Sequence, residues 1–255
     1  MFNPETIDKI LSAQIETEPF NHIVIDDFFN ESFANGLAEE FPDYSDDRWY
    51  RYDNPIEVKR TMNFWDRFPK LTYNAFWFLC SQKFSDILSR KIGKPLYADY
   101  GLNGGGWHMH GNSGKLNIHQ DYSIHPKIPL QRKLNIIIYL SKDWNPEWGG
   151  GLELWSHDAE KNKAKEMVKR IDVKFNRAVI FDTTQNSWHG LPEKLTCPDG
   201  VYRKSLAIYY VQEPDESVQM RSKAWYAPYQ DQENDESVLE FIEKRKHATP
   251  IVRGI

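Results

Sequence analysis

The sequence predicts a mainly β protein of the α+β class, a distorted double-stranded β-helix (jelly roll) with helices packed on one sheet. Short β-like runs follow one another after residue 95, separated by clusters of Gly, Pro and Asn. Helical patterns are concentrated before that point. A helical layer followed by many short strands is typical of a double-sheet jelly roll with flanking helices.

The first 95 residues predict that layer. The run from His22 to Ile25 is β-rich, and Asn30 is placed to cap a helix that ends near Phe41. Residues 45–67 lack periodicity, which predicts loop with short strands. Apolar residues recur at helical spacing over 69–92, before Gly93 and Pro95. We expect the Phe and Trp side chains of this helix in the core.

The rest of the chain predicts the jelly roll and a tail. Residues 159–170 form a Lys-rich surface excursion, and residues 231–246 form an exposed helix. No repeat or linker divides the chain, so one domain is expected over 1–255, with a layer over 1–95, a core over 96–212 and an extension over 213–255. The expected strands are 96–102, 116–121, 133–140, 151–155, 171–173, 178–181 and 205–212.

Composition excludes several classes of protein. A net charge of −5 argues against a general nucleic-acid binder. Cys80 and Cys197 lie far apart, so free thiols in a reducing compartment are expected. The N-terminus lacks a secretory signal pattern, and the apolar stretches are too short to span a bilayer. A cytoplasmic location is the default expectation, with no membrane partner, and the oligomeric state stays open.

One histidine–carboxylate pattern carries chemistry. In His119-Gln120-Asp121 the outer two residues project from the same face of a strand, so they can bind one ion together. His189 follows 70 residues later, after the apolar run 178–181. Two histidines and a carboxylate on one face of an octahedral ion form the facial triad of non-haem iron(II) oxygenases. The HxD pattern alone is common by chance.

A second polar set follows on neighbouring strands. Arg203 and Ser205 share a strand face, and an arginine fork suits bidentate binding of a carboxylate. Asn135 and Tyr139 share a face of another strand with Ile137. If buried, these polar groups need partners, and a dicarboxylate ligand supplies them. The alternative for Arg203 is a surface arginine at a strand edge, paired with an acid.

The order of these motifs resembles a known family. HxD, RKLNIIIYLSKDW, WGGGLELW, a late histidine and RxS together resemble the prolyl-hydroxylase-like branch of the 2-oxoglutarate/iron(II) oxygenase superfamily. The stretch ADYGLNGGGWHMHGNSGKLNIHQDYSIHP is similar to bacterial and phage members of that branch. With PFNHIVIDDFF near the start, the similarity covers roughly residues 20–212.

The resemblance implies cofactors and residue roles. Iron(II), 2-oxoglutarate and O2 are the implied cofactors, with ascorbate as an accessory reductant. The iron ligands would be His119, Asp121 and His189. Arg203 would hold the distal carboxylate of 2-oxoglutarate, aided by Tyr139, Ser205 and Asn135, and Arg132 stands where prolyl hydroxylases hold a substrate-contacting arginine.

The substrate is the open point of the resemblance. Hydroxylation of a prolyl residue in a peptide or protein is the first candidate, and a free amino acid or a sugar- or nucleotide-linked metabolite is the alternative. Met109 and Leu116 stand where prolyl hydroxylases often have aromatic residues, which weakens the case for prolyl specificity. Cupin-like isomerases and ligand-binding modules share the HxD and distal histidine but have no need of Arg203 with Tyr139.

The glycine-rich stretch before His119 predicts a lid. Residues 103–113, together with 122–131, are expected to form a mobile entrance in which Trp107 and Met109 contact substrate. The alternative is a solvated hairpin loop whose aromatic residues pack onto the barrel. His108 and His110 are expected in a substrate-facing or solvated loop and not in a second metal site, and His125 is expected to shape the loop after Asp121.

Overall fold

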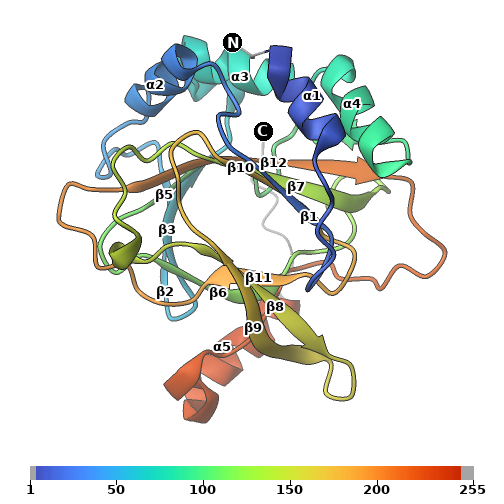
Figure 1. Cartoon of the computed structure of the whole chain (residues 1–255). Helices are drawn as coiled ribbons and strands as arrows, with labels where there is room; N and C mark the ends of the chain where they lie inside the picture. The colour runs from blue at the N-terminus through green and yellow to red at the C-terminus, as the bar shows by residue number, and fades with distance from the viewer. Residues whose placement is uncertain (1–3, 248–255) are drawn as a thin grey trace.

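A computed structural model describes residues 4–247, in which the strands form one curled antiparallel sheet. Its path runs β1-β10-β7-β12-β5-β3-β6-β11-β8-β9, so the sheet folds back on itself into two facing layers (Figure 1). One layer holds β1, β10, β7, β12 and β5, and the other holds β6, β11, β8 and β9. This arrangement confirms the predicted jelly-roll architecture.

The strands are short, as the pattern predicts. Their bounds are β1 His22–Ile25, β2 Tyr50–Asn54, β3 Glu57–Met62, β4 Tyr97–Ala98, β5 Gly106–His110, β6 Lys115–Gln120, β7 Gln131–Tyr139, β8 Leu152–Asp158, β9 Lys163–Ile171, β10 Ala178–Asp182, β11 Trp188–Leu191, β12 Arg203–Gln212 and β13 Trp225–Tyr226.

In the described part of the chain, α1 to α4 cover the layer that contains β10, β7 and β12, and α5 lies below the other layer (Figure 1). Asn30 caps the second helix by accepting a hydrogen bond from the Ser32 N–H, as predicted. The helix bounds are α1 Pro4–Ser12, α2 Glu31–Glu39, α3 Lys70–Leu79, α4 Gln82–Ile92 and α5 Glu236–His247, with short 3-10 turns at Trp65–Arg67, Pro146–Trp148 and Gln230–Asn234. In the described part of the chain no helix is long and apolar enough to cross a membrane.

Two predictions for the helical layer are wrong. The expected helix over 69–92 is divided in two, because the Ser81 hydroxyl accepts the Phe84 N–H and starts α4 as a separate helix. Trp77 is 65% exposed and lies outside the core, although Phe76 and Phe84 are fully buried as expected. The apolar spacing alone did not reveal the break.

One strand prediction and two predictions for the connecting segments are corrected. The run 96–102 pairs only over Tyr97–Ala98. The Lys-rich excursion is exposed but forms most of β9, an edge strand that pairs with β8 alone among residues 4–247. Charged side chains on such an edge discourage pairing with another chain. The predicted mobile loop over 103–113 is wrong over 106–110, which is strand β5 between β12 and β3.

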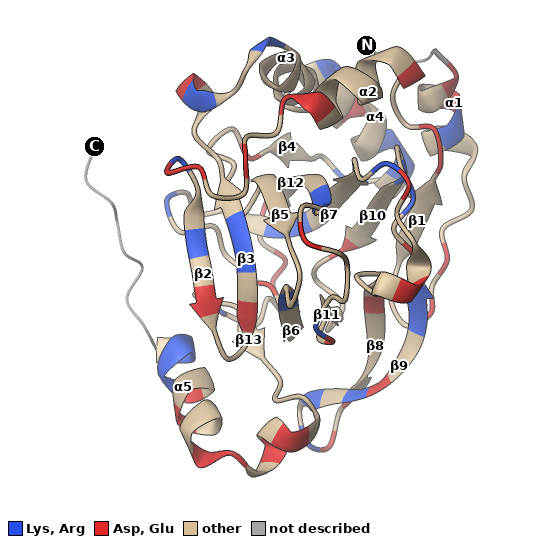
Figure 2. Cartoon of the chain, turned by 90° about the vertical axis from the view of Figure 1, so that its left-hand side faces the viewer, with Lys and Arg blue, Asp and Glu red and all other residues tan. Residues whose placement is uncertain are grey.

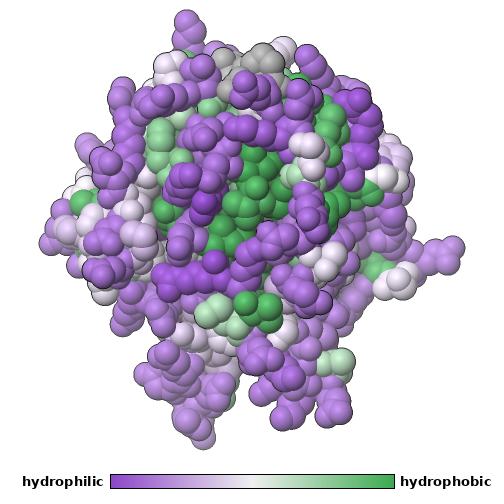
Figure 3. Space-filling view, in the orientation of Figure 1, coloured by the Kyte–Doolittle hydropathy of each residue, from purple (hydrophilic) through white to green (hydrophobic). Residues whose placement is uncertain are grey.

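The two largest hydrophobic clusters of the described residues lie on either side of the layer that the helices cover. The larger one lies between the helices and the layer beneath them. The smaller one lies between the two layers and includes Phe181 of β10 with Leu152 and Leu154 of β8. Hydrophobic side chains are visible in Figure 3 in the space that separates the layers in Figure 1. Cys80 and Cys197 are buried free thiols, as predicted.

Trp107 belongs to the larger cluster. Its side chain is fully buried, stacks on Phe41 with ring centroids 5.0 Å apart, and meets Phe68 edge to face. Because Trp107→Ala would leave a large cavity, we expect it to lower the free energy of unfolding by about 3–5 kcal/mol. Urea unfolding followed by circular dichroism measures this, and the exposed Trp77→Ala is the control. Wild-type stability with altered turnover would instead support the lid.

Asp26 joins the end of β1 to residues beside β10. Hydrogen bonds from Arg177 lower the pKa of Asp26 to about 2, against the cost of burial, and Lys174 adds a second ion pair at 2.7 Å. This carboxylate therefore stabilises the fold above its unfolded pKa near 4, and that contribution is lost as the pH falls toward 2. Since the side chain is 35% exposed, we expect Asp26→Asn to cost up to about 1 kcal/mol at neutral pH. Unfolding curves between pH 2 and pH 7 should converge for the two proteins at low pH, and a constant difference would contradict the linkage.

Candidate active site

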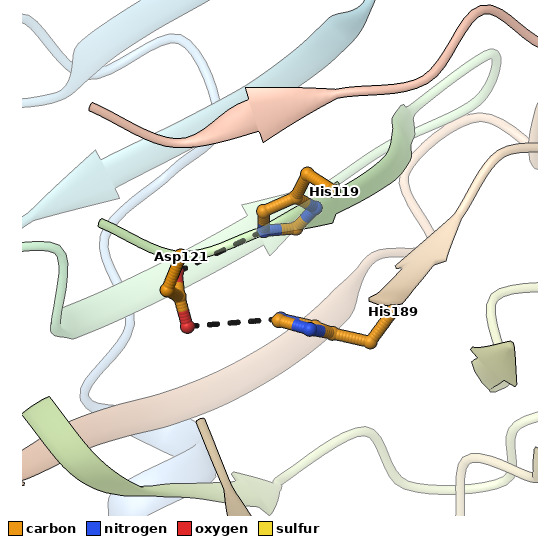
Figure 4. A group of neighbouring side chains, drawn as sticks. All are labelled: His119, Asp121 and His189. Carbon is orange, nitrogen blue, oxygen red and sulfur yellow. Dashed lines mark ion pairs between the residues drawn. The ribbon is translucent and has the colours of Figure 1, made fainter. Parts of the chain in front are cut away.

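Two paired strands bring the predicted triad together. His119 lies near the end of β6, Asp121 follows that strand, and His189 lies on β11 directly opposite His119 in the antiparallel register. The Nε2 atoms of His119 and His189 lie 3.9 Å from Oδ1 and Oδ2 of Asp121, respectively (Figure 4). All three side chains are buried, and their ligand atoms lie within 4.8 Å of one another. The pairing of β6 with β11 therefore brings together two histidines that lie 70 residues apart in the sequence.

The two histidines present the same nitrogen to this centre. The Nδ1 atoms of His119 and His189 lie 2.9 and 2.8 Å from the carbonyl oxygens of Asn117 and Ser187. These carbonyls accept from Nδ1–H, so each Nε2 carries the lone pair. Burial lowers the pKa of His119 to about 3 and also lowers that of His189, which favours neutral imidazoles. This state is the one that binds metal.

Asp121 is held as a carboxylate by its surroundings. Burial raises the pKa of Asp121, but His189 and Arg132 outweigh burial and hold the pKa below its usual value. The Tyr209 hydroxyl donates to Oδ1 at 3.1 Å, and an Arg132 nitrogen lies 3.5 Å from the same oxygen. Two neutral imidazoles and a carboxylate form a donor set that fits iron(II), and they leave three coordination positions free. No other group of metal-ligating side chains of this kind is found within residues 4–247.

The second predicted set lies in the same cavity. Arg203 and Ser205 on β12 and Asn135 on β7 line it together with the triad. The Arg203 side chain is buried, Nε donates to the Gly150 carbonyl at 2.7 Å, and the guanidinium lies over the Tyr139 ring. Arg203 forms no ion pair with an acid of the described chain, so the alternative of a surface arginine at a strand edge is wrong.

Polar atoms with few partners surround this arginine. Oδ1 of Asn135 is buried without a hydrogen-bond partner in the described residues, and the buried Tyr139 hydroxyl interacts with the Arg203 guanidinium. Buried polar groups are ordinarily paired, so their presence next to an uncompensated guanidinium indicates a polar ligand. A dicarboxylate supplies the negative charge that the guanidinium lacks, and it offers acceptors to the Tyr139 O–H and to the amide N–H of Asn135, whose Oδ1 needs a donor instead.

Arg132 is tightly enclosed beside the metal-binding group. Its guanidinium lies between the rings of Tyr122 and Tyr209, at 3.4 Å from each centroid. It also donates to the Asn103 carbonyl and to the Tyr122 hydroxyl. Alternation along β12 places Tyr209 on the face of Arg203 and Ser205, so the period of two could have revealed this residue from the sequence.

Trp107 and Met109, for which substrate contact is predicted, lie away from the cavity in this structure. Both side chains point from β5 into the helix-side core and do not line the cavity. Since neighbouring residues of a strand face opposite sides, His108 and His110 line the cavity instead. His125 shapes the following loop as expected: its Nδ1 accepts the N–H groups of Lys127 and Ile128.

The tail contributes a wall that sequence reasoning missed. Tyr226 of β13 stacks on the His119 ring at 5.2 Å, because β13 pairs with β6. Arg245 of α5 reaches Glu57 of β3 at 2.6 Å. Both Tyr226 and Arg245 line the cavity, whose volume is about 320 Å³. No local pattern marks these residues, since their position depends on how the tail folds back.

The fold is a jelly roll, and its cavity holds two imidazoles and a carboxylate that could bind one metal ion. The model of the 2OG-Fe(II) oxygenase superfamily matches residues 105–211, the segment that carries the triad and Arg203. The match covers β5 to β12, and the iron(II) and 2-oxoglutarate cofactors of that superfamily fit the donor set and the buried arginine of this segment. No curated protein is significantly similar to the chain in sequence.

Solved structures confirm the resemblance to prolyl-hydroxylase-like enzymes in the fold. A prolyl-4-hydroxylase from Pseudomonas putida superposes with a TM-score of 0.54 at 12% identity, over 82% of this chain and 98% of that one. A prolyl hydroxylase from Trichoplax adhaerens, in complex with a hypoxia inducible factor peptide, gives 0.53 at 15% identity, over 82% and 88%. HygX from Streptomyces hygroscopicus, with nickel, 2-oxoglutarate and hygromycin B bound, gives 0.51 at 14% identity, over 83% and 88%.

Proposed function

We propose that the protein is a dioxygenase that uses iron(II), 2-oxoglutarate and O2 to hydroxylate an unactivated C–H bond. The observation that carries this proposal is the shared cavity: a buried His–Asp–His group opens onto the same space as a buried arginine that lacks an acidic partner. A cupin-like isomerase or a simple metal-binding module would not require this arginine.

The three triad residues would hold the metal through Nε2 of His119, Nε2 of His189 and a carboxylate oxygen of Asp121. The carbonyls of Asn117 and Ser187 orient the imidazoles, and the Tyr209 hydroxyl orients the carboxylate. Arg132 contacts Asp121 and two tyrosines, which makes it a positioning residue in this proposal. It is therefore less available to substrate than the resemblance implies.

At the other end, Arg203 would bind the distal carboxylate of 2-oxoglutarate through its free guanidinium nitrogens. Ser205 and Asn135 line the same space, and Tyr139 lies beneath the guanidinium, so all three are placed to complete the hydrogen bonds. When bound, iron(II) and 2-oxoglutarate would activate O2, so that one oxygen atom goes to succinate and the other to the substrate, with release of carbon dioxide. The chain orients these groups and keeps water out of the cavity.

The C–H substrate is the finer part of the proposal. A prolyl residue of a peptide is supported by the fold shared with two prolyl hydroxylases, and a small molecule is supported by the fold shared with HygX. Leu116 lines the cavity where prolyl hydroxylases often have an aromatic residue, and Met109 faces the core. These departures make the small-molecule alternative at least as well supported as the prolyl one.

The direct test is turnover of 2-oxoglutarate by protein reconstituted anaerobically with iron(II). Succinate release is measured with and without a panel of peptides and metabolites, and products are searched for a gain of one oxygen by mass spectrometry. We expect slow succinate release alone and faster release with the substrate. Absence of both succinate release and 2-oxoglutarate binding would contradict the proposal.

A further inference from the structure

The cavity contains an excess of positive charge. Five cationic side chains line it against the two carboxylates of Glu57 and Asp121: Lys59, Arg132, Arg203, Lys223 and Arg245. Burial lowers the pKa of His108 to about 3 and holds that of His110 well below its usual value, so the histidines add no charge. The cavity therefore carries three positive charges in a chain whose net charge is −5.

The cofactors of the proposed function leave this excess unchanged. Iron(II) and the 2-oxoglutarate dianion carry opposite charges of equal size. Asp121 and Arg132 also offset one another beside the metal-binding group. The uncompensated positive charge thus lies on Arg203 and on the cationic side chains around Glu57. In the proposed function 2-oxoglutarate binds Arg203, so the cations around Glu57 remain without a ligand.

Lys59, Lys223 and Arg245 form the cationic wall of the cavity. Lys59 lies on β3, Lys223 precedes β13, and Arg245 lies near the end of α5 (blue on β3 and α5 in Figure 2). Glu57 pairs with both Lys59, at 3.1 Å, and Arg245, at 2.6 Å. Lys223 has no acidic partner among residues 4–247. The cationic wall thus has three positive charges beside the single carboxylate of Glu57, which pairs with two of them.

An unsatisfied imidazole in the same cavity independently indicates a polar ligand. His110 is 2% exposed, and neither of its ring nitrogens has a hydrogen-bond partner in the described part of the chain. A buried imidazole without partners is costly unless a ligand supplies them. Burial is the main cause of its low pKa, and Arg203 and then Lys59 lower it further, so His110 lies within electrostatic range of both.

We propose that the molecule hydroxylated here is a small molecule with a carboxylate or phosphate group, bound by Lys59 and Lys223. This inference rests on the proposed function and names the substrate class of the same site. Ammonium groups at the edge of a low-dielectric cavity bind such anions by charge-assisted hydrogen bonds. Arg245 holds α5 against Glu57 and adds to the positive potential.

The size of the cavity favours a small molecule over a segment of acidic protein. About 320 Å³ is at the lower end of the range for small-molecule sites, and 2-oxoglutarate fills part of it. The Lys59 side chain is only 12% exposed, so an acidic peptide on the surface would not reach its ammonium group. A compact anion that enters the cavity would.

The first experiment uses inorganic phosphate as the probe. The full chain is loaded with zinc and saturating 2-oxoglutarate, so that Arg203 is occupied, and phosphate is titrated by calorimetry. We expect saturable binding that is weaker by at least about tenfold in Lys223→Gln and in Lys59→Gln, as for loss of a charged hydrogen bond. Lys161→Gln, on the exposed turn between β8 and β9, is the matched control and should bind as the wild type does.

Lys223→Gln keeps the test independent of folding, since it breaks no ion pair of the described chain. Its thermal unfolding should match that of the control. Absence of saturable phosphate binding, or binding that is equal in all variants (an adventitious ion only), would overturn the proposal. If the zinc-loaded chain does not bind 2-oxoglutarate when this ligand is titrated before phosphate, the proposed function itself is rejected.

The second experiment compares substrates in matched pairs, such as N-acetylproline with N-acetylprolinamide and glucose 6-phosphate with glucose. We expect succinate release to be stimulated by an anionic member of such a pair. Lys223→Gln should raise the KM for that member by about tenfold, with the KM for 2-oxoglutarate unchanged. Stronger stimulation by a neutral partner, or by an acidic peptide with blocked ends, would overturn the inference.

Discussion

His189→Ala is expected to abolish metal-dependent turnover and to weaken metal binding by more than about 100-fold. Loss of groups that only orient a metal ligand typically costs 10–100-fold, and this change removes a ligand itself. His189 is buried, and its Nε2 faces Asp121 across 3.9 Å, so a neighbouring side chain is not free to replace it. Titration of the apo protein with zinc, followed by calorimetry, measures the affinity.

The control for this prediction is a histidine remote from the cavity. His247 lies exposed at the end of α5 and pairs with Glu243, so His247→Ala should bind metal as the wild type does. Thermal unfolding without metal separates a folding defect from the loss of a ligand. If His189→Ala binds one zinc ion per chain with wild-type affinity, the proposed ligand set is wrong.

Arg203→Ala is expected to weaken 2-oxoglutarate binding by about 2–5 kcal/mol, the cost of truncating one partner of a buried charge pair. Metal binding should persist, because Arg203 contacts none of the three proposed ligands. Arg203→Lys should recover only part of the affinity, since an ammonium group lacks the planar fork. Calorimetry with zinc-loaded protein measures both variants.

The matched control is Arg67→Ala, which removes an exposed guanidinium that does not line the cavity. It should leave the affinity for 2-oxoglutarate unchanged. Equal affinity in Arg203→Ala and in the wild type would show that another group binds the distal carboxylate. The cationic wall described above would then be the first place to look.

Sequence reasoning succeeded where the signal was local. The HxD spacing placed His119 and Asp121 on one strand face, and the same period of two placed Ser205 beside Arg203. Asn30 was recognised as a helix cap because its side chain satisfies a backbone N–H two residues away. In each case the interacting groups lie within a few residues, so the covalent chain itself sets the geometry.

It failed where the strand face or the pairing partner is chosen by distant contacts. Glycines around Trp107 predicted a loop, but pairing of β5 with both β12 and β3 makes it a strand in mid-sheet. The alternation then turns Trp107 and Met109 toward the helices, and His108 and His110 toward the cavity. A shift by one residue would exchange the two sets, and nothing local specifies it.

The sequence by itself therefore determined the jelly-roll class, the donor types of the metal-binding group and the arginine opposite it. Tertiary structure alone decided that His189 faces His119, through the pairing of β11 with β6. It also decided that the tail supplies Lys223, Tyr226 and Arg245 to the cavity. The physical reason is that these contacts join segments tens to nearly two hundred residues apart, whose approach depends on burial of the whole core and not on local backbone preference.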